Sequence, residues 1–227
     1  RDSFECLRNA MPRTTWSLIA MEDRAGGHVY PDVVTHVLPQ DDVAAYERVA
    51  DDLNLSGVET VFVQHEFGIY GGESGSHLLV LLRRLRMPVI VTLHTILEKP
   101  NTVQKRVLDE IIRIAAGVIV MSEMGADILE RVHGGGPKKV HVIPHGAPER
   151  PFSSTEPFKA PLGLAGPKVI MTFGLLSPNK GIETIIKGLP SILARHPDAV
   201  YLIAGATHPH LVANEGDAMN DDIARSH

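Results

Sequence analysis

Short apolar runs rich in β-branched residues recur along the chain, and their spacing is regular. Three of them begin about 29 residues apart, which is close to the length of one β-α unit. Both faces of these runs are apolar, as is typical of parallel strands buried between helices, because a strand with one face in water would alternate. The pattern predicts a first parallel sheet with strands at residues 15–20, 33–38, 58–64, 88–93, 117–121 and 139–143.

The segments between these runs carry helical periodicity and residues that begin or end helices. The pair Asp41-Asp42 offers an N-cap ahead of one amphipathic stretch, and Ser122 offers one ahead of another, which the glycines from Gly134 onward would end. Helices are therefore expected at residues 43–53, 76–86, 101–116 and 122–133. Strands that alternate with helices in this way predict an α/β domain with a doubly wound, Rossmann-like sheet over residues 1–148.

The composition changes after this domain. Five prolines stand between Pro144 and Pro161, where apolar periodicity is weak, so residues 149–166 are expected to form an interdomain linker. The β-α-β pattern then resumes, with strands at 168–173 and 200–204 around a helix at 181–195. Because two strands cannot bury both faces of a sheet, residues 167–227 are expected to form only part of a second Rossmann-like domain.

Overall composition narrows the classes of function. The chain has 22 Lys and Arg against 27 Asp and Glu, a net charge of −5, which argues against a nucleic-acid partner because phosphate backbones are bound by basic surfaces. The single cysteine, Cys6, excludes an internal disulfide and a multi-cysteine zinc site. No run approaches the length of apolar sequence that spans a membrane, so a cytoplasmic protein is expected. The first residue is Arg1, and the chain is expected to be a fragment.

Polar residues follow several predicted strands, at the edge where open α/β sheets bind ligands. His65 and Glu66 come after one strand, and His94 comes after the next. Adjacent residues on a strand point opposite ways and no H-E-x-x-H motif is present, so no metal site is predicted. His94 is a candidate for a polar side chain that faces a substrate. The alternative is a core or surface histidine with a structural role only.

Two further features suit phosphate binding. The backbone of the glycine-rich segment from Gly68 to Gly75 could approach an anion, although a mobile loop with a tight turn accounts for the glycines equally well. Lys180 begins a helix, where its charge opposes the helix dipole, and a bound anion such as a phosphate is one reason for a lysine at this position. No G-x-G-x-x-G fingerprint follows any strand, which argues against an NAD-dependent Rossmann enzyme.

Four stretches of the sequence together resemble the group 1, or family 4, glycosyltransferases of the GT-B fold. The stretch FGLLSPNKGIETIIKGLPSILARHPDAVYLIAGATHP is similar to the first β-α-β unit of their donor domain. KKVHVIPHGAP is similar to the segment between their domains, and PVIVTLHT to their strand that ends in histidine. VFVQHEFGIYGGESG resembles a loop variant in their acceptor domain. The chain thus resembles an N-terminal acceptor domain followed by the start of a donor domain.

This resemblance implies an enzyme of the hexosyltransferase type that moves a sugar from a nucleotide-diphosphate donor to an acceptor, with retention. Lys180 would contact the donor diphosphate, Gly174 would let the backbone approach it, and His94 would be the catalytic residue facing the transferred sugar or the acceptor. The acceptor would be a carbohydrate or a lipid-linked molecule, and the family is compatible with contact at a membrane surface. No cofactor and no protein-bound metal is expected, since the nucleotide-diphosphate sugar is a substrate.

The same resemblance assigns four residues to the acceptor or substrate loop: His65, Glu66, Gly71 and Gly72. The sequence departs from the family at Leu175, where the family has an arginine. The family's glycine loop after its first strand would lie before Arg1, and its paired glutamates spaced E-x7-E are absent. The parent protein is therefore expected to be active, whereas the activity of this chain stays open.

Two other functions stay open on the sequence. A GT-B-like nucleotide-sugar epimerase or a phosphorylase would share the architecture, and its product would be a free epimer or a sugar phosphate. A non-catalytic nucleotide-sugar-binding module, or a vestigial one, would bind the donor without turning it over.

Overall fold

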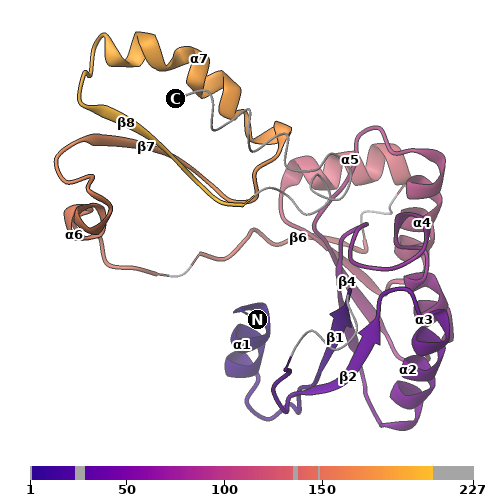
Figure 1. Ribbon diagram of the computed structural model, residues 1–227. Coiled ribbons are helices and arrows are strands. Elements are labelled where there is room, and N and C mark those ends of the chain that lie inside the picture. The colour runs from indigo at the N-terminus through magenta and orange to yellow at the C-terminus, as the bar shows by residue number, and fades with distance from the viewer. Residues whose placement is uncertain (1, 24–28, 135–137, 148, 207–227) are drawn as a thin grey trace. The chain divides into compact units, whose positions relative to one another are not determined.

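The computed structural model describes residues 2–23, 29–134, 138–147 and 149–206. The chain divides into two compact units, residues 1–147 (unit 1) and residues 148–227 (unit 2). Figure 1 shows both units. The last residue of the first predicted domain, Pro148, and the end of the second, residues 207–227, lie outside the described residues.

Unit 1 is built on a four-stranded parallel sheet. Its strands follow the chain in the order β3-β4-β5-β6, and every neighbouring pair is parallel. The bounds are β3 (Val61–His65), β4 (Val89–Leu93), β5 (Gly117–Val120) and β6 (Val140–Val142). These strands confirm the four apolar runs predicted between residues 58 and 143.

Helices connect these strands, and their ends follow from local sequence. Asp42 accepts a hydrogen bond from the Ala45 backbone N–H at 3.2 Å and caps its helix as predicted, and Ser122 caps another through the Gly125 N–H at 3.0 Å. Gly134 ends the last helix in the left-handed conformation. The helices are α2 (Val43–Leu55), α3 (Leu78–Arg84), α4 (Thr102–Ile114) and α5 (Glu123–His133).

Helices α2, α3 and α4 lie side by side along one face of the sheet (Figure 1). Each connection from β3 to β6 moves one strand in the same direction, and right-handed crossovers that share a direction put their helices on the same face. Alternate strand residues point to this face and are buried against the helices; the core includes Tyr46, Val63, Leu78, Val91, Leu108, Ile111 and Val118. The opposite strand residues, such as Phe62 and Ile90, are exposed or half-buried.

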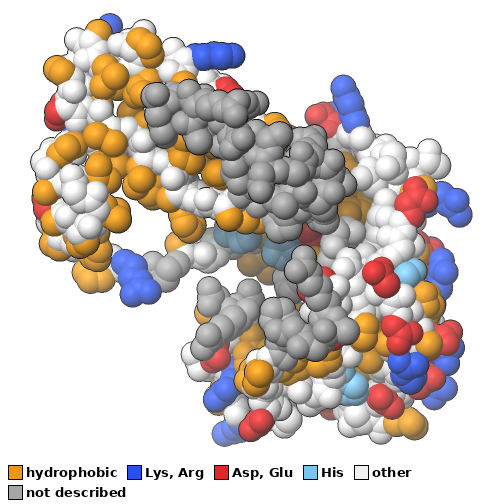
Figure 2. Space-filling model, in the orientation of Figure 1, with side chains coloured by type: hydrophobic (Ala, Val, Ile, Leu, Met, Phe, Trp, Pro, Cys, Tyr) orange, Lys and Arg blue, Asp and Glu red, His pale blue; other side chains and the backbone are white. Residues whose placement is uncertain are grey.

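The outer side of these helices is charged. Figure 2 shows acidic and basic side chains interspersed over it. Arg83 Nε lies 3.1 Å from Glu110 Oε1, and Arg84 Nη2 lies 2.8 Å from Asp51 Oδ2, so α3 is tied to both neighbouring helices. Such exposed pairs each contribute about 0–1 kcal/mol, and the buried apolar face holds the layer together.

The first two strands differ from the predicted arrangement. β1 (Leu18–Glu22) and β2 (Val34–Pro39) pair in parallel with each other and form a separate two-stranded sheet. Their side chains join the same core, where Leu38 is 2% exposed and Met21 packs against it. Side-chain packing, rather than a continuous hydrogen-bond ladder, thus links the first predicted strands to the main sheet. Helix α1 (Asp2–Ala10), ahead of them, is not predicted.

Unit 2 holds a second parallel pair, β7 (Lys168–Phe173) and β8 (Ala199–Ala204), with α7 (Ile182–Leu193) between them. The 3-10 helix η3 (Pro178–Lys180) precedes α7. The predicted linker contains a helical turn, α6 (Glu156–Lys159), followed by η2 (Ala160–Leu162). Figure 2 shows hydrophobic side chains on the surface of this unit, which agrees with a two-stranded sheet that cannot cover both faces.

Candidate functional site

The carboxyl ends of β3 and β4 bring His94 and Gln64 into contact. His94 directly follows β4, and its backbone N–H donates to the His65 carbonyl at 3.1 Å, which extends the ladder between the strands. His94 Nε2 lies 2.8 Å from Gln64 Oε1. Both residues are exposed, so the imidazole sits where a ligand at this edge could reach it.

A second side-chain bond crosses the same two strand ends. The Thr95 hydroxyl donates to Glu66 Oε1. Glu66 is half-buried, and this hydrogen bond positions its carboxylate. The predicted residues Glu66 and His94 are thus both at this edge, each tied to a partner from the neighbouring strand.

A hollow of about 220 Å³ opens beside His94. Apart from His94 and Ser122, its walls are mostly apolar: Leu93, Ile96, Met121, Met124, Gly125 and Ile128. The hollow lies where β4 and β5 end and α5 begins, the position at which open α/β sheets bind ligands.

Two residues at this edge were missed as site residues in the sequence. Gln64 contacts His94, but nothing in its own local pattern marks it. His145 follows β6, and its ring centroid lies 6.2 Å from that of His94. The signal for His145 is its place just beyond a strand, the same signal that identifies His94.

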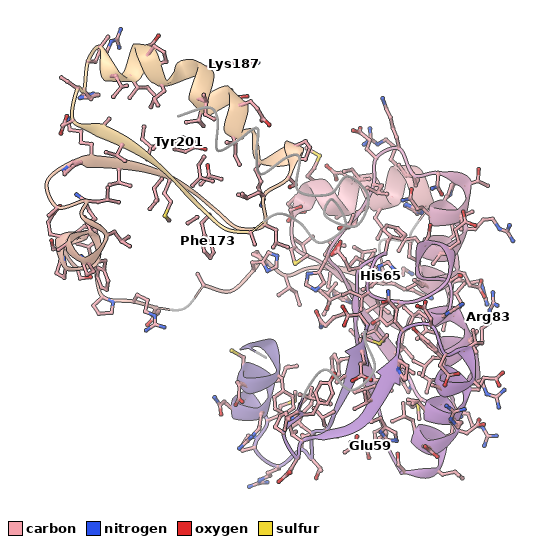
Figure 3. All side chains as sticks on the ribbon, viewed as in Figure 1. Glu59, His65, Arg83, Phe173, Lys187 and Tyr201 are labelled. Atoms are coloured by element: carbon pink, nitrogen blue, oxygen red, sulfur yellow. The ribbon has the colours of Figure 1, made fainter. Side chains whose placement is uncertain are left out.

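His65, in contrast, does not lie on the accessible edge. It shares the alternation of Val61 and Val63, so its ring points toward the helices and is 0% exposed. The ring stacks on Tyr70 with centroids 6.2 Å apart and meets Phe67 edge-on at 5.1 Å. Figure 3 labels His65 within unit 1.

Both ring nitrogens of His65 are buried without a hydrogen-bond partner among the described residues. Burial disfavours the charged imidazole and, with the nearby His94, lowers the pKa of His65 to about 4. A neutral, enclosed ring of this kind supports the loop from inside and does not contact a ligand at the sheet edge.

The glycine-rich loop is a tight turn packed against the segment after β2. A Cβ on Gly71 would lie 2.0 Å from the Gln40 carbonyl oxygen, so no other residue fits there. The Gly71 N–H donates to the Tyr46 hydroxyl at 3.3 Å, and Gln40 Nε2 donates to the Gly68 carbonyl at 3.0 Å. Gly72 has φ +75°, which favours glycine.

Several N–H groups in and next to this loop donate within the protein. Gly75 donates to the Gly72 carbonyl at 3.2 Å, and His77 donates to the Gly71 carbonyl at 3.0 Å. Of the two interpretations of the glycines, the tight turn therefore describes the loop better than an anion cradle does.

In unit 2, the two residues assigned to the diphosphate come together. Gly174 follows β7 with φ +129°, and a Cβ built on it would lie 3.6 Å from Lys180 Nζ. The ammonium group thus lies close to the half-buried backbone at the end of the strand. Lys180 is exposed, and no salt bridge joins it to a carboxylate among the described residues.

Gly205 is a third glycine at this strand end, and it lies directly after β8. A Cβ on Gly205 would lie 1.7 Å from the Gly174 carbonyl oxygen, so the two strands approach closely only because Gly205 has no side chain. The Gly174 N–H donates to the Ala204 carbonyl at 3.0 Å. Leu175, the position of the family's arginine, is 45% exposed.

Two classes of feature are not found in the part of the chain that the structure describes. It contains no group of three or more His, Cys, Asp or Glu arranged to hold a metal ion. None of its helices has the length and apolar character needed to cross a membrane.

Residues 69–149 match the family model described as Glycosyltransferase Family 4. The match covers about a third of the chain and includes the turn at Gly71 and Gly72, His94 and His145. It supports the resemblance to the group 1, or family 4, glycosyltransferases that the sequence motifs indicate. No curated protein sequence matches the chain.

Two solved structures align with the chain. A glycosyltransferase from Rickettsia africae ESF-5 aligns with a TM-score of 0.55 and 12% identity, over 88% of this chain and 62% of that one. The accessory secretory protein 1, 2 and 3 structure from Streptococcus pneumoniae aligns with a TM-score of 0.45 and 13% identity, over 80% of this chain and 34% of that one. The chain thus spans less than two thirds of each of these structures. Its fold, shared with the Rickettsia glycosyltransferase, is the Rossmann-like α/β fold of the GT-B type.

Proposed function

We propose, from the match of residues 69–149 to glycosyltransferase family 4, that this protein takes part in sugar transfer from a nucleotide-diphosphate donor to an acceptor, with retention. The observation that carries the proposal is that the Lys180 ammonium group lies close to the Gly174 backbone at the end of β7. A departing diphosphate gains negative charge in the transition state, and a preorganised cation beside it stabilises that charge by several kcal/mol.

The donor side of the proposal rests on unit 2. Lys180 contacts the diphosphate, and Gly174 lets the same group approach its backbone because it has no side chain of its own. The nearest described acidic side chain along the sequence, Glu183, makes no salt bridge with Lys180. The proposal includes no cofactor and no protein-bound metal, because the nucleotide-diphosphate sugar is a substrate.

The acceptor side rests on unit 1. His94 faces the sugar or the acceptor hydroxyl, and the hollow beside it takes part of the acceptor. Glu66 forms the rim with Thr95, while Gly71 and Gly72 shape the turn behind it. The acceptor is a carbohydrate or lipid-linked molecule, no nucleic acid is involved, and the proposed location is cytoplasmic, with contact at a membrane surface compatible with the family.

Titration calorimetry of the 227-residue chain with UDP, GDP and their sugar conjugates tests the donor side. We expect micromolar binding of one base class, and Lys180→Ala should weaken it at least tenfold, or about 1.4 kcal/mol. Lys187→Ala is the matched control, because Lys187 is an exposed lysine of the same unit on α7 (Figure 3). Equal affinities for the wild type and Lys180→Ala would refute the role assigned to Lys180.

A further inference from the structure

The side-chain amide of Gln64 lies between two polar neighbours. Its Oε1 lies 2.8 Å from His94 Nε2, and its Nε2 donates to the Thr92 hydroxyl at 3.5 Å. Gln64 and Thr92 are register partners in the parallel ladder, and His94 comes two residues later on the same face. The strand register therefore places the amide between a hydroxyl and an imidazole.

This orientation determines which nitrogen of His94 carries the proton. With Gln64 Oε1 facing His94 Nε2, the nitrogen is the donor, because an amide oxygen only accepts hydrogen bonds. The neutral ring is then the Nε2–H form, with its lone pair on Nδ1. Within the described residues Nδ1 has no hydrogen-bond partner, and the exposed ring leaves it open to solvent.

The charged and titratable groups around His94 are few. Glu66 is bonded to Thr95, the ring of His145 lies 6.2 Å away, and the buried His65 lies on the neighbouring strand. None of these forms a hydrogen bond with the His94 ring. Gln64 is thus the single described side chain that fixes the tautomer.

We propose that Gln64 is a positioning residue that holds His94 in the Nε2–H form and turns the Nδ1 lone pair to the ligand side of the sheet edge. A substrate hydroxyl can then donate to Nδ1, which identifies the atom of His94 that meets the acceptor or the transferred sugar. This last step rests on the proposed function, whereas the tautomer and its dependence on Gln64 do not.

Long-range ¹H–¹⁵N correlation spectra of the 227-residue chain test the proposal, recorded at a pH where the imidazoles are neutral. In the wild type, we expect His94 to show a protonated Nε2 and an unprotonated Nδ1. In Gln64→Leu, the Nδ1–H form should also become populated. Gln64→Glu places a carboxylate on Nε2, and should raise the titration midpoint of His94 by about one pH unit, because an adjacent negative charge favours imidazolium.

Thr60→Glu is the control, because it adds the same charge just before β3, away from His94. It should shift the His94 midpoint far less. A wild-type Nδ1–H form, an unchanged tautomer in Gln64→Leu, or equal shifts in the two glutamate variants would each overturn the proposal. Calorimetry with the nucleotide donors is independent of these spectra, so loss of the proposed function and loss of the Gln64 role are distinguishable.

Discussion

The buried imidazole of His65 makes the stability of unit 1 depend on pH. In the unfolded chain its pKa is near 6.5, whereas burial lowers the pKa in the folded chain to about 4. Between these values the unfolded state takes up a proton that the folded state does not. Stability contributed by the neutral ring is therefore complete above about pH 6.5 and is lost as the pH falls toward 4.

The size of the effect follows from the two pKa values. At 1.36 kcal/mol per pKa unit, the difference between 6.5 and about 4 amounts to about 3 kcal/mol. About 2.5 kcal/mol of this is lost between pH 7.5 and pH 4.5. His65→Leu removes the titrating group with little change in volume, and so should remove that part of the pH dependence.

At pH 7.5 the variant should be about as stable as the wild type. Two unpartnered ring nitrogens cost about 1–3 kcal/mol, and their removal offsets the loss of the ring contacts with Phe67 and Tyr70, worth about 0.5–1.5 kcal/mol each. The variant should thus become more stable than the wild type only in acid.

Urea unfolding at a series of pH values measures this, followed by the fluorescence of Trp16, the only tryptophan and a residue of unit 1. The control is His141→Gln, because His141 is exposed on β6. The control should keep the wild-type slope of unfolding free energy against pH. If His65→Leu also keeps that slope, the ring is not held neutral by burial and the reasoning fails.

Two other substitutions test local features of the fold. Asn101→Ala removes the capping box of α4, in which the Asn101 side chain accepts from the Gln104 N–H at 2.8 Å, and should lower the unfolding free energy of unit 1 by about 1 kcal/mol in the Trp16 assay; Thr102→Ala, one residue on, should not. Gly205→Ala forces a Cβ into the Gly174 carbonyl and should destabilise unit 2 by about 1–3 kcal/mol, seen as faster hydrogen exchange of the β7 and β8 amides. The control is Gly188→Ala in α7, where the added Cβ meets open space, and it should slow the exchange of the same amides. Faster exchange in Gly188→Ala, or unchanged exchange in Gly205→Ala, would contradict the argument.

The sequence alone determined most of the secondary structure. The apolar runs predict β3 to β8 because parallel strands are rich in apolar, β-branched residues. The expected burial of both faces is wrong for β3, where Val63 is buried against the helices and Phe62 on the other face is 38% exposed. The caps at Asp42 and Ser122 were predicted because a helix start needs a side-chain acceptor within a few residues. Such signals are local, and tertiary packing leaves them intact.

The site was predicted only in part. His94 could be predicted because the end of a parallel strand places any residue at the ligand edge of the sheet. Lys180 and Gly174 were predicted through the family resemblance, and the structure brings them together. His65, however, lies inside the core, since its alternation on β3 directs it toward the helices.

The tertiary structure decided the contacts between strands. The Gln64–His94 bond depends on the register of β3 against β4, and the approach of Gly205 to Gly174 depends on that of β8 against β7. The pairing of β1 with β2 alone was also not predicted. Each of these joins residues far apart in sequence, and such contacts are selected by packing of the whole core rather than by the periodicity of any one segment.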